Sequence, residues 1–464
     1  MKILVKWPTR GCPEGFEERF KKWYSTQSGR HQIRYLFTVD QDDAQTLEAV
    51  EKCQWSHDPY LRGATVGNTS GFHIQVIPAA GKIAACNSGI NPDGSIVELN
   101  DHKVPIGDWD VLILASDDFS PEVHGWDDVV VRAMTWHFPA MDGLLHFPDA
   151  WHSGEGYTLT PPAPGMTPIV GRQPLVTIPI MGINYYKRFG YVYHPAYKSE
   201  FCDNEQTWVS TMFGKRRFID VPIFRHFWRG YFNKDATNHA NLLAGRPDRT
   251  VFEARKANNF DRKKPRLSIL VCALERRREE SKKLFDEIYR QIFALPDPWT
   301  VELHVLLDEG HINVGEKRNI LMARANGDYL CFVDDDDWVA PNYIQALVKK
   351  CDGGTDCVVF GASYTCDGKP GRPFDFDLKY PRYADNEKMF ERTPNHLTPI
   401  KSSIAKSIVF PNLTRAEDNH YAVRVRRLLK SQSVCVGNGV SGKDELYHYR
   451  FNHAGTATES RRTP

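Results

Sequence analysis

Short, uninterrupted runs of apolar residues, each followed at once by polar residues, recur along the whole chain. Examples are KILVKW (2–7), WDVLILAS (109–116), LSILVCAL (267–274) and DYLCFV (328–333). Such runs are typical of strands buried on both faces, as in a parallel sheet, because neither face of the strand meets water. Stretches such as REESKKLFDEIYRQIF (278–293) separate the runs and predict helices. The pattern therefore predicts an α/β fold with a mostly parallel sheet.

The same order of elements occurs twice along the chain. The corresponding pairs are KILVKWPTR (2–10) with LSILVCALERR (267–277), IRYLFTVDQDD (33–43) with VELHVLLDEG (301–310), WDVLILASDDFSP (109–121) with DYLCFVDDDDWVAP (328–341), FCDNEQTW (201–208) with RAEDNHYA (415–422), and IFRHFW (223–228) with LYHYRF (446–451). Five correspondences in one order predict a duplicated domain. We expect domains at 1–240 and 267–464, joined by a basic helical connector at 241–266.

Composition agrees with two globular domains and narrows the function. A chain of 464 residues is too long for one ordinary core, and its net charge of +1 provides no global attraction to nucleic acid or anionic membranes. No apolar run approaches the roughly 20 residues that span a bilayer, and the N-terminus lacks a signal-peptide core. The ten cysteines contain no CxxC pair and several lie in strand-like runs. We therefore expect a cytoplasmic protein with reduced thiols and no membrane insertion.

Aspartates cluster at the ends of two predicted strands. Asp117 and Asp118 follow the first, and Asp334 to Asp337 follow the second. Ligands of open α/β sheets bind outside the carboxyl ends of the strands. Aspartates at i and i+2 of an extended chain project to one side, so Asp334 with Asp336, or Asp335 with Asp337, predict a shared divalent cation. Carboxylate oxygens suit Mg²⁺ or Mn²⁺, which leave coordination positions for substrate phosphates.

A helix predicted between Gly315 and Gly327 carries Lys317 and Arg318 near its start. These cations can point at an anion, and together with a metal they indicate a nucleoside diphosphate. Other interpretations remain open. The aspartates could form a solvated turn, the cations an ordinary charged helix face, and the acidic pair Glu417 and Asp418 a favourable helix start.

The run NVGEKRNILMARANGDYLCFVDDDD (313–337) resembles the family-two glycosyltransferases with the Rossmann-like GT-A fold, and the resemblance extends over roughly 267 to 453. It implies a hexosyl- or pentosyltransferase that uses a nucleotide-sugar donor, most simply a UDP-sugar. The residues it implies are Asp334 and Asp336 for the metal, Asp335 and Asp308 beside the nucleotide sugar, Asp418 as general base with Glu417 as its neighbour, His448 as a later metal ligand, and Arg450 at the phosphates.

The chemistry of sugar transfer asks for the same residue types. The charge that grows on the leaving diphosphate must be stabilised, which a metal and cations do. A base must also take the proton of an acceptor hydroxyl, and metal-bound aspartates cannot easily do so. A separate carboxylate such as Asp418 meets this need and favours inversion at the anomeric carbon.

The first half also resembles a GT-A glycosyltransferase, of a kind common among environmental and phage-like sequences, over about 1 to 260. KILVKWPTRG (2–11), GKIAACNSGI (81–90) and MGINYYKRFGYVYHPAYKSEFCDNEQTWV (181–209) carry the likeness. The residues implied by position are Thr9, Arg10, Asp40, Lys82 and Asn87 for the nucleotide sugar, Asp117, Asp118 and His226 for metal, and Asp203 or Glu205 as base. Ser116 replaces the first aspartate of a strict Asp-x-Asp, so a decayed copy that serves as a scaffold or acceptor-binding module is the alternative.

Two rival functions come from other classes. Aromatic and basic residues mix in YYKRFGYVYHPAY (185–197) and KANNFDRKKPR (256–266), which is a pattern of single-strand nucleic-acid binding. A combined form would glycosylate modified bases of phage DNA. A nucleotidyltransferase on a similar sheet is the third possibility. For the glycosyltransferase, we expect the acceptor to be a glycan, a small molecule or modified DNA.

Overall fold

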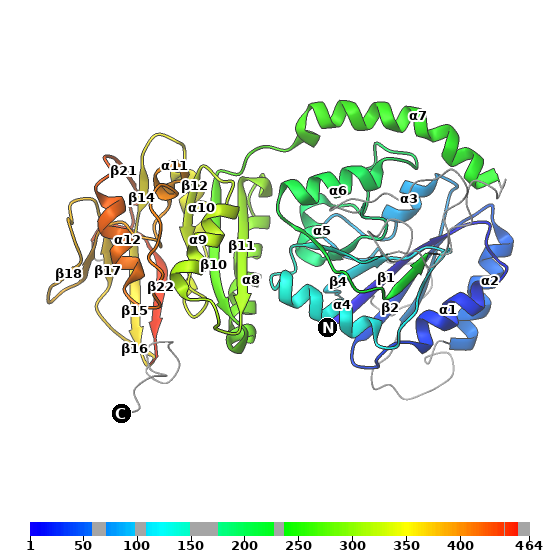
Figure 1. Ribbon diagram of the computed structural model, residues 1–464, viewed down its shortest axis with the longest axis horizontal. Coiled ribbons are helices and arrows are strands. Elements are labelled where there is room, and N and C mark those ends of the chain that lie inside the picture. The colour runs from blue at the N-terminus through cyan, green and yellow to red at the C-terminus, as the bar shows by residue number, and fades with distance from the viewer. Residues whose placement is uncertain (58–70, 98–107, 149–174, 227–235, 440, 453–464) are drawn as a thin grey trace. The chain divides into compact units, whose positions relative to one another are not determined.

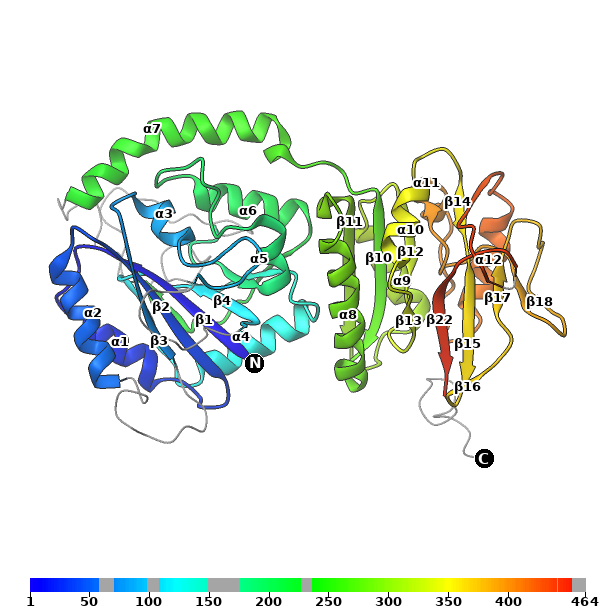
Figure 2. The ribbon, with the colours of Figure 1, turned by 180° about the vertical axis from the view of Figure 1, so that it is seen from behind.

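The computed structural model describes residues 1–57, 71–97, 108–148, 175–226, 236–439 and 441–452. The chain divides into two compact units, Met1–Asp261 and Arg262–Pro464. Figures 1 and 2 show the first unit from blue to green and the second from green to red.

The first unit is built on a seven-stranded sheet in the order β3-β2-β1-β4-β7-β6-β8. Its strands are β1 (Lys2–Thr9), β2 (Gln32–Asp40), β3 (Gly71–Ile77), β4 (Val111–Leu114), β6 (Leu144–His146), β7 (Ile180–Gly182) and β8 (Arg216–Phe218), with a separate pair β5 (Phe119–Pro121) and β9 (Phe224–His226). Its helices are α1 (Phe16–Ser25), α2 (Ala44–His57), α3 (Lys82–Asn87), α4 (Trp126–His137), α5 (Ile183–Phe189), α6 (Cys202–Met212) and α7 (Ala236–Ala257), followed by the 3₁₀ turn η1 (Asn259–Asp261).

Both faces of this sheet are covered, which explains the uninterrupted apolar runs. Ile3, Val5 and Trp7 of β1 point into a core with α1, α2 and α4, whereas Leu4 points into a second core with α3, α5, α6 and α7. Figure 1 shows the two helical layers on the two sides of the sheet. Successive residues of a strand face opposite sides, so a strand between two cores is mostly apolar on both faces.

The second unit has two sheets. The main sheet has the order β11-β10-β12-β20-β14-β21, and the second sheet has the order β13-β22-β15-β17-β19-β18, with β16 beside β15. The main strands are β10 (Leu267–Leu274), β11 (Val301–Asp308), β12 (Tyr329–Phe332), β14 (Cys357–Val359), β20 (Ile400–Lys401) and β21 (Gln432–Val434). The second sheet contains β13 (Trp338–Val339), β15 (Gly361–Cys366), β16 (Lys369–Pro370), β17 (Phe374–Phe376), β18 (Ala384–Asp385), β19 (Phe390–Arg392) and β22 (Glu445–Phe451).

The helices of this unit lie between and around these strands. They are α8 (Arg278–Phe293), α9 (Val314–Arg324), α10 (Tyr343–Lys350), α11 (Ser402–Ala405) and α12 (Glu417–Arg426), with 3₁₀ turns η2 (Glu275–Arg277) and η3 (Pro298–Thr300). Helix α8 packs against α10, and α9 packs against α12. Among the described residues, no helix is long and apolar enough to cross a membrane.

Six strands of the two main sheets correspond one to one. The order β2-β1-β4-β7-β6-β8 of the first unit matches β11-β10-β12-β20-β14-β21 of the second. The directions match too, because only β7 and β20 run antiparallel to their neighbours. In both units a short antiparallel pair, β5 with β9 or β13 with β22, begins directly after the aspartates. The predicted α/β fold with mostly parallel sheets is confirmed.

The range expected to be a connector contains most of α7 and lies largely within the first unit. The Asp248 carboxylate accepts hydrogen bonds from the backbone N–H groups of Lys198, Ser199 and Glu200. Arg255 forms an ion pair with Glu205 of α6. These polar contacts attach α7 to α6 and to the loop that precedes it.

Candidate functional site

The four aspartates after β12 alternate between the interior and the solvent. The side chains of Asp334 and Asp336 are 28% and 32% exposed, whereas that of Asp335 is 5% exposed and Asp337 is fully buried. Asp335 and Asp336 form a β-turn that is closed by a hydrogen bond of 3.1 Å from the Asp337 N–H to the Asp334 carbonyl, so the extended conformation expected from the sequence is not found here. The structure therefore distinguishes the two possible pairs, and only Asp334 and Asp336 are accessible to a ligand.

The buried aspartates anchor the strand end to its neighbours. Asp335 accepts hydrogen bonds from the Leu274 backbone N–H (2.9 Å) and from Arg277 Nη1 (2.6 Å). Asp337 accepts hydrogen bonds from the Tyr447 hydroxyl and the Arg450 backbone N–H, both at 2.7 Å. Arg277 also pairs with Asp336 at 2.8 Å. Asp335, expected beside the nucleotide sugar, is thus turned into the protein.

Burial and mutual repulsion shape the titration of this cluster. Burial raises the pKa of Asp335 to about 6, although Arg277 opposes the shift. Burial raises the pKa of Asp337 well above its usual range, and the neighbouring carboxylates Asp334 and Asp336 raise it further. Burial acts most strongly and in the direction of raising the pKa of Asp334, but the Arg318 guanidinium and the His396 imidazole together outweigh it and hold that pKa below the usual range.

The two cations of α9 face the interior. The buried Arg318 guanidinium donates to Glu417 Oε1 at 2.7 Å and to Asp334 Oδ1 at 3.2 Å. The buried Lys317 ammonium pairs with Asp308 and donates to the Ala273 carbonyl at 3.1 Å. The expectation that both cations point at a substrate anion is not supported, because a buried cation needs a buried partner and each has one within the protein. Asp308 is likewise engaged by Lys317.

Helix α12 places the acidic pair beside Arg318. Its N-cap, Ala416, has φ of 62°, and the helix starts with Glu417. Glu417 is buried against Arg318, while Asp418 is partly exposed and accepts a hydrogen bond from the Tyr383 hydroxyl at 3.5 Å. The Tyr383 oxygen accepts in turn from Asn395 Nδ2 at 2.8 Å. Of the pair, Asp418 is the carboxylate that can reach a ligand.

His396 belongs to this site and was not predicted. It is buried, its Nε2 lies 3.6 Å from Asp334 Oδ2, and neither ring nitrogen makes a hydrogen bond within the protein. The segment NHLTPI (395–400) is buried throughout although it begins with two polar residues. The signal in the sequence is the pair of polar residues, Asn395 and His396, shortly before strand β20, and it could have indicated His396 as a site residue.

The structure places His448 away from the aspartates. Tyr447 faces Asp337, so the next residue of β22 points to the opposite face of the sheet. There the two ring nitrogens of His448 lie 2.6 Å from the Ser363 hydroxyl and 3.4 Å from the Thr365 hydroxyl. A role for His448 as metal ligand is not supported by this geometry. Arg450 binds the Asp337 carbonyl at 2.9 Å and lies over the Trp338 ring, so it too is engaged within the protein.

The accessible carboxylates fit a divalent cation that takes most of its ligands from substrate and water. Within the described ranges, no three His, Cys, Asp or Glu side chains are grouped so that they could hold a metal ion. Asp334 and Asp336 offer hard oxygen donors at a partly exposed position. Mg²⁺ is commonly held by one or two carboxylates plus phosphate oxygens, and Mn²⁺ suits the same donors.

Two local features align the site of the first unit with that of the second. The Asn87 side chain bonds to the backbone of Val192 and Tyr193, and Asn319 bonds in the same way to both backbone groups of Phe410. Helix α6 starts after Phe201, whose φ of 61° matches that of Ala416 before α12.

This alignment pairs residues across the two units. Cys86 then corresponds to Arg318, Cys202 to Glu417, and Asp203 to Asp418. Cys86 and Cys202 are both buried.

The first unit keeps part of the acidic site. The Trp7 indole donates to Asp117 at 3.0 Å, and the Ser116 hydroxyl donates to Asp118 at 2.5 Å. Burial raises the pKa of Asp117 to about 6. His226 pairs through its backbone with Phe119, and its side chain lies outside the described residues.

The predicted nucleotide contacts of the first unit are engaged to different degrees. Thr9 is buried at the end of β1, and Arg10 pairs with Asp40 and, at 2.6 Å, with Asp42. Lys82 is exposed at the start of α3, within electrostatic reach of Asp203.

The two base candidates of this unit differ in burial. Glu205 accepts hydrogen bonds from Arg255 at 2.7 and 2.8 Å and from Tyr197 at 2.7 Å, so it is buried and paired. Asp203 is partly exposed. Of the two, Asp203 is the one placed to meet a ligand.

Comparisons with known proteins bear on the second unit. Residues 286–407 match the model of the family "Glycosyl transferase family 2". The second unit contains a glycosyltransferase family 2 domain. The matched range includes α9 and the four aspartates but ends before Glu417 and Asp418. A stretch of 154 residues is 27% identical to "Putative glycosyltransferase EpsH" of Bacillus subtilis (strain 168), covering 30% of this chain and 42% of that protein. The chain thus spans less than half of the relative's length.

Solved structures show more distant likenesses. The S. aureus TarS 1–349 complex with UDP-GlcNAc is 15% identical, covering 43% of this chain and 62% of that one, with a TM-score of 0.32. The mannosyltransferase PcManGT from Pyrobaculum calidifontis, in complex with GDP-Man and Mn²⁺, is 14% identical, covering 52% and 62%, with a TM-score of 0.33. These likenesses are too distant to assign a ligand or a reaction to this chain.

Proposed function

We propose that the family 2 domain is a metal-dependent glycosyltransferase that moves a sugar from a nucleotide-sugar donor, most simply a UDP-sugar, to an acceptor hydroxyl with inversion. The observation that carries the proposal is the grouping around Arg318. This buried cation bonds to Asp334 and Glu417, and each of these carboxylates has a partly exposed neighbour, Asp336 or Asp418. Arg318 would therefore position both the proposed metal ligands, Asp334 and Asp336, and the proposed base, Asp418.

Asp334 and Asp336 would hold Mg²⁺ or Mn²⁺, which when bound would neutralise charge on the departing diphosphate. Asp418 would accept the proton of the acceptor hydroxyl. The Tyr383 hydroxyl orients that carboxylate by donating to one of its oxygens, which leaves the other free for the acceptor. Glu417 and Lys317 act through positioning, because both are buried in ion pairs.

We further propose that residues 1–240 form a second, related glycosyltransferase-like domain, with Asp117 and Asp118 near the donor and Asp203 as the base. The shared order of six strands supports a duplication. A cytoplasmic location fits the ten cysteines, none of which forms a disulfide.

The test is donor turnover by the full-length chain. The protein is incubated with UDP-sugars and GDP-sugars in the presence of Mn²⁺, and released nucleoside diphosphate is measured with and without EDTA. We expect metal-dependent release with at least one donor. A parallel incubation with nucleoside triphosphates and sugar 1-phosphates tests the nucleotidyltransferase, which would release pyrophosphate there and no nucleoside diphosphate from the nucleotide sugars. Turnover unaffected by EDTA would contradict the metal assignment.

A further inference from the structure

The second sheet of the family 2 domain carries a row of aromatic side chains on one face. Tyr449, Tyr364, Phe374 and Phe390 come from the adjacent strands β22, β15, β17 and β19, one residue from each. Tyr364 pairs with Tyr449 and Phe374 pairs with Phe390 in the strand register. Their ring centroids lie 5.7 Å and 4.7 Å apart, and all four side chains are only half-buried. Tyr364 also contacts Phe374, at 5.8 Å, so the four rings are contiguous, and the Arg372 and Arg392 guanidinium groups lie over Phe390 at 4.3 Å and 5.3 Å.

This aromatic row begins at the acidic site. Tyr447 lies two residues before Tyr449 and therefore shares its face, and its hydroxyl bonds to Asp337. At the other end, the Arg392 guanidinium lies over the rings of Phe374 (5.1 Å) and Tyr383 (4.8 Å). Tyr383 in turn donates to Asp418, the proposed base. The aromatic row thus contacts the aspartate cluster through Tyr447 and the proposed base Asp418 through Arg392 and Tyr383.

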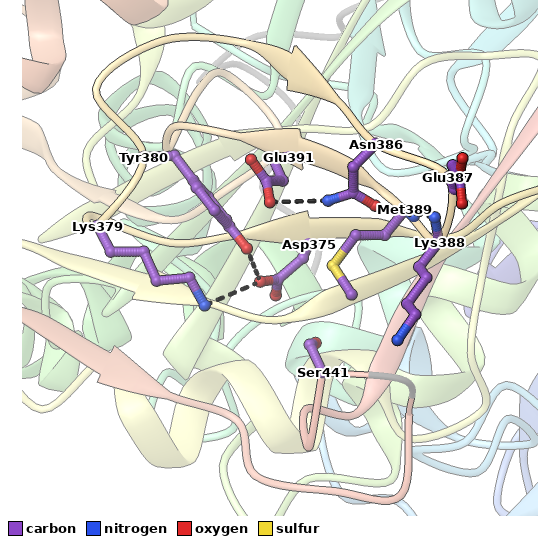
Figure 3. Close-up of a pocket in the computed structure, with 9 residues that line it drawn as sticks. All are labelled: Asp375, Lys379, Tyr380, Asn386, Glu387, Lys388, Met389, Glu391 and Ser441. Carbon is purple, nitrogen blue, oxygen red and sulfur yellow. Dashed lines mark hydrogen bonds and ion pairs between the residues drawn. The ribbon is translucent and has the colours of Figure 1, made fainter.

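The opposite face of the same sheet holds a cavity of about 550 Å³, shown in Figure 3. Asp375 and Glu391 line it, and each is the strand neighbour of an aromatic residue of the row, Phe374 or Phe390. Neighbouring residues of a strand face opposite sides, so this cavity is separated from Asp418 by the sheet. An acceptor bound there would not reach the proposed base, whereas one on the aromatic row would.

Resting on the function proposed above, we propose that the aromatic row is the acceptor site and that the acceptor is an uncharged sugar ring. The C–H faces of a pyranose pack on aromatic rings, while its hydroxyl groups remain at the edge, where Asp418 can meet one of them. Charge decides against a polyanion such as DNA. The neighbouring carboxylates Asp334, Asp336 and Asp418 repel phosphates. Of the two cations at the row, Arg392 is already paired with Asp385 at 2.7 Å, and Arg372 donates to the Asn386 carbonyl.

The test measures binding and turnover separately on the full chain. Methyl β-D-glucopyranoside, methyl β-D-galactopyranoside and methyl α-D-mannopyranoside are the probes, and saturation-transfer NMR reports their binding without any need for turnover. The variants Phe390→Leu and Tyr364→Leu each remove a flat ring and keep an apolar side chain. Glu391→Gln is the matched control, since it alters the adjacent residue on the cavity face and its carbonyl can still accept from Asn386.

We expect at least one glycoside to bind wild type and Glu391→Gln equally, and to bind both ring variants about tenfold more weakly. In turnover assays the acceptor KM of the ring variants should rise by about the same factor, with the donor KM within about twofold of wild type. Equal binding by all variants, or equal weakening by Glu391→Gln, would overturn the acceptor site.

A duplex oligonucleotide containing 5-hydroxymethylcytosine tests the other class of acceptor. Binding of this duplex without binding of any glycoside would also overturn the inference. The proposed function fails separately. Glycoside binding that depends on the rings, without turnover of any donor, would contradict the reaction and keep the site. Donor turnover with an acceptor KM that the ring variants leave unchanged would contradict the acceptor site and keep the reaction.

Discussion

Arg318 donates a hydrogen bond of 2.7 Å to Glu417, 99 positions later in the chain, and the corresponding residues of the first unit are two buried cysteines, Cys86 and Cys202. The third partner changes as well, because Ser116 stands where the second unit has Asp334. A buried ion pair has to be replaced as a set, since a buried charge left without its partner is costly. The two units therefore share a backbone arrangement and differ in whether its centre is charged.

This relationship predicts a non-additive set of variants. Arg318→Cys alone leaves Glu417 and Asp334 without their cation and should cost about 3–5 kcal/mol of unfolding free energy. The triple variant Arg318→Cys, Glu417→Cys, Asp334→Ser copies the first unit and should recover much of that loss, because no unpaired charge remains. Urea unfolding of each variant measures the coupling. Additive losses would show that the positions do not interact.

Asp336→Asn should abolish donor turnover while the protein stays folded. The side chain is partly exposed, and its partner Arg277 keeps its hydrogen bond to Asp335, so stability should change by less than about 0.5 kcal/mol. Turnover with saturating Mn²⁺ should fall by at least about 100-fold. Asp335→Asn is the contrasting variant. It weakens the buried anchor to Leu274 and Arg277, and should lower the melting temperature. Unchanged turnover in Asp336→Asn would refute its role at the metal.

Asp418→Asn should retain donor binding and lose transfer, because the amide cannot accept the acceptor proton. We expect a fall in kcat of about 10²–10⁴-fold with little change in donor affinity. Isothermal titration with the active nucleotide sugar measures the second quantity. Tyr383→Phe removes only the hydrogen bond of 3.5 Å to this carboxylate, and should give a much smaller loss of kcat. Retained transfer in Asp418→Asn would assign the base elsewhere.

In the first unit, Glu205→Gln should lower the free energy of unfolding, whereas Asp203→Asn should leave it unchanged. Glu205 is buried and binds Arg255 and Tyr197, so neutralising it leaves the Arg255 cation without its main partner. We expect a loss of about 2–4 kcal/mol. Asp203 is partly exposed and its variant should unfold like wild type. Chemical unfolding compares the two directly, and equal stabilities would contradict the contrast.

Lys6 predicts a pH-dependent stability. It is buried next to the hydroxyl groups of Thr38 and Ser88, and burial lowers its pKa from 10.5 to about 7. Between pH 7 and 10.5 the unfolded chain binds a proton at Lys6 that the folded chain does not, so the free energy of unfolding rises with pH across this window. Below about pH 7 both states are protonated, and the destabilisation caused by burying this amine is then at its full size. The free energy of unfolding of wild type should gain up to about 1.4 kcal/mol per pH unit relative to Lys6→Met between pH 7.5 and 9.5. Parallel pH profiles would show that Lys6 is charged in the folded state.

The sequence alone determined the α/β class, the repeated order of elements and the positions of the aspartates. These follow from local chemistry, because a strand buried on both faces is mostly apolar, and most of its polar residues lie at its end. The acidic pair at 417–418 was also predictable, since its place relative to the aspartates repeats in the first half.

Only the tertiary structure decided which of these side chains are accessible. The four aspartates lie in a turn after β12, and the sequence does not say which of them meet the neighbouring strands. The hydrogen bonds of Asp335 to β10 and of Asp337 to β22 settled that question, and left Asp334 and Asp336 toward solvent. The same applies to Arg318, which the sequence suggested for a substrate. Its partner Glu417 is distant in sequence, and a buried cation is neutralised by whichever carboxylate the fold brings against it.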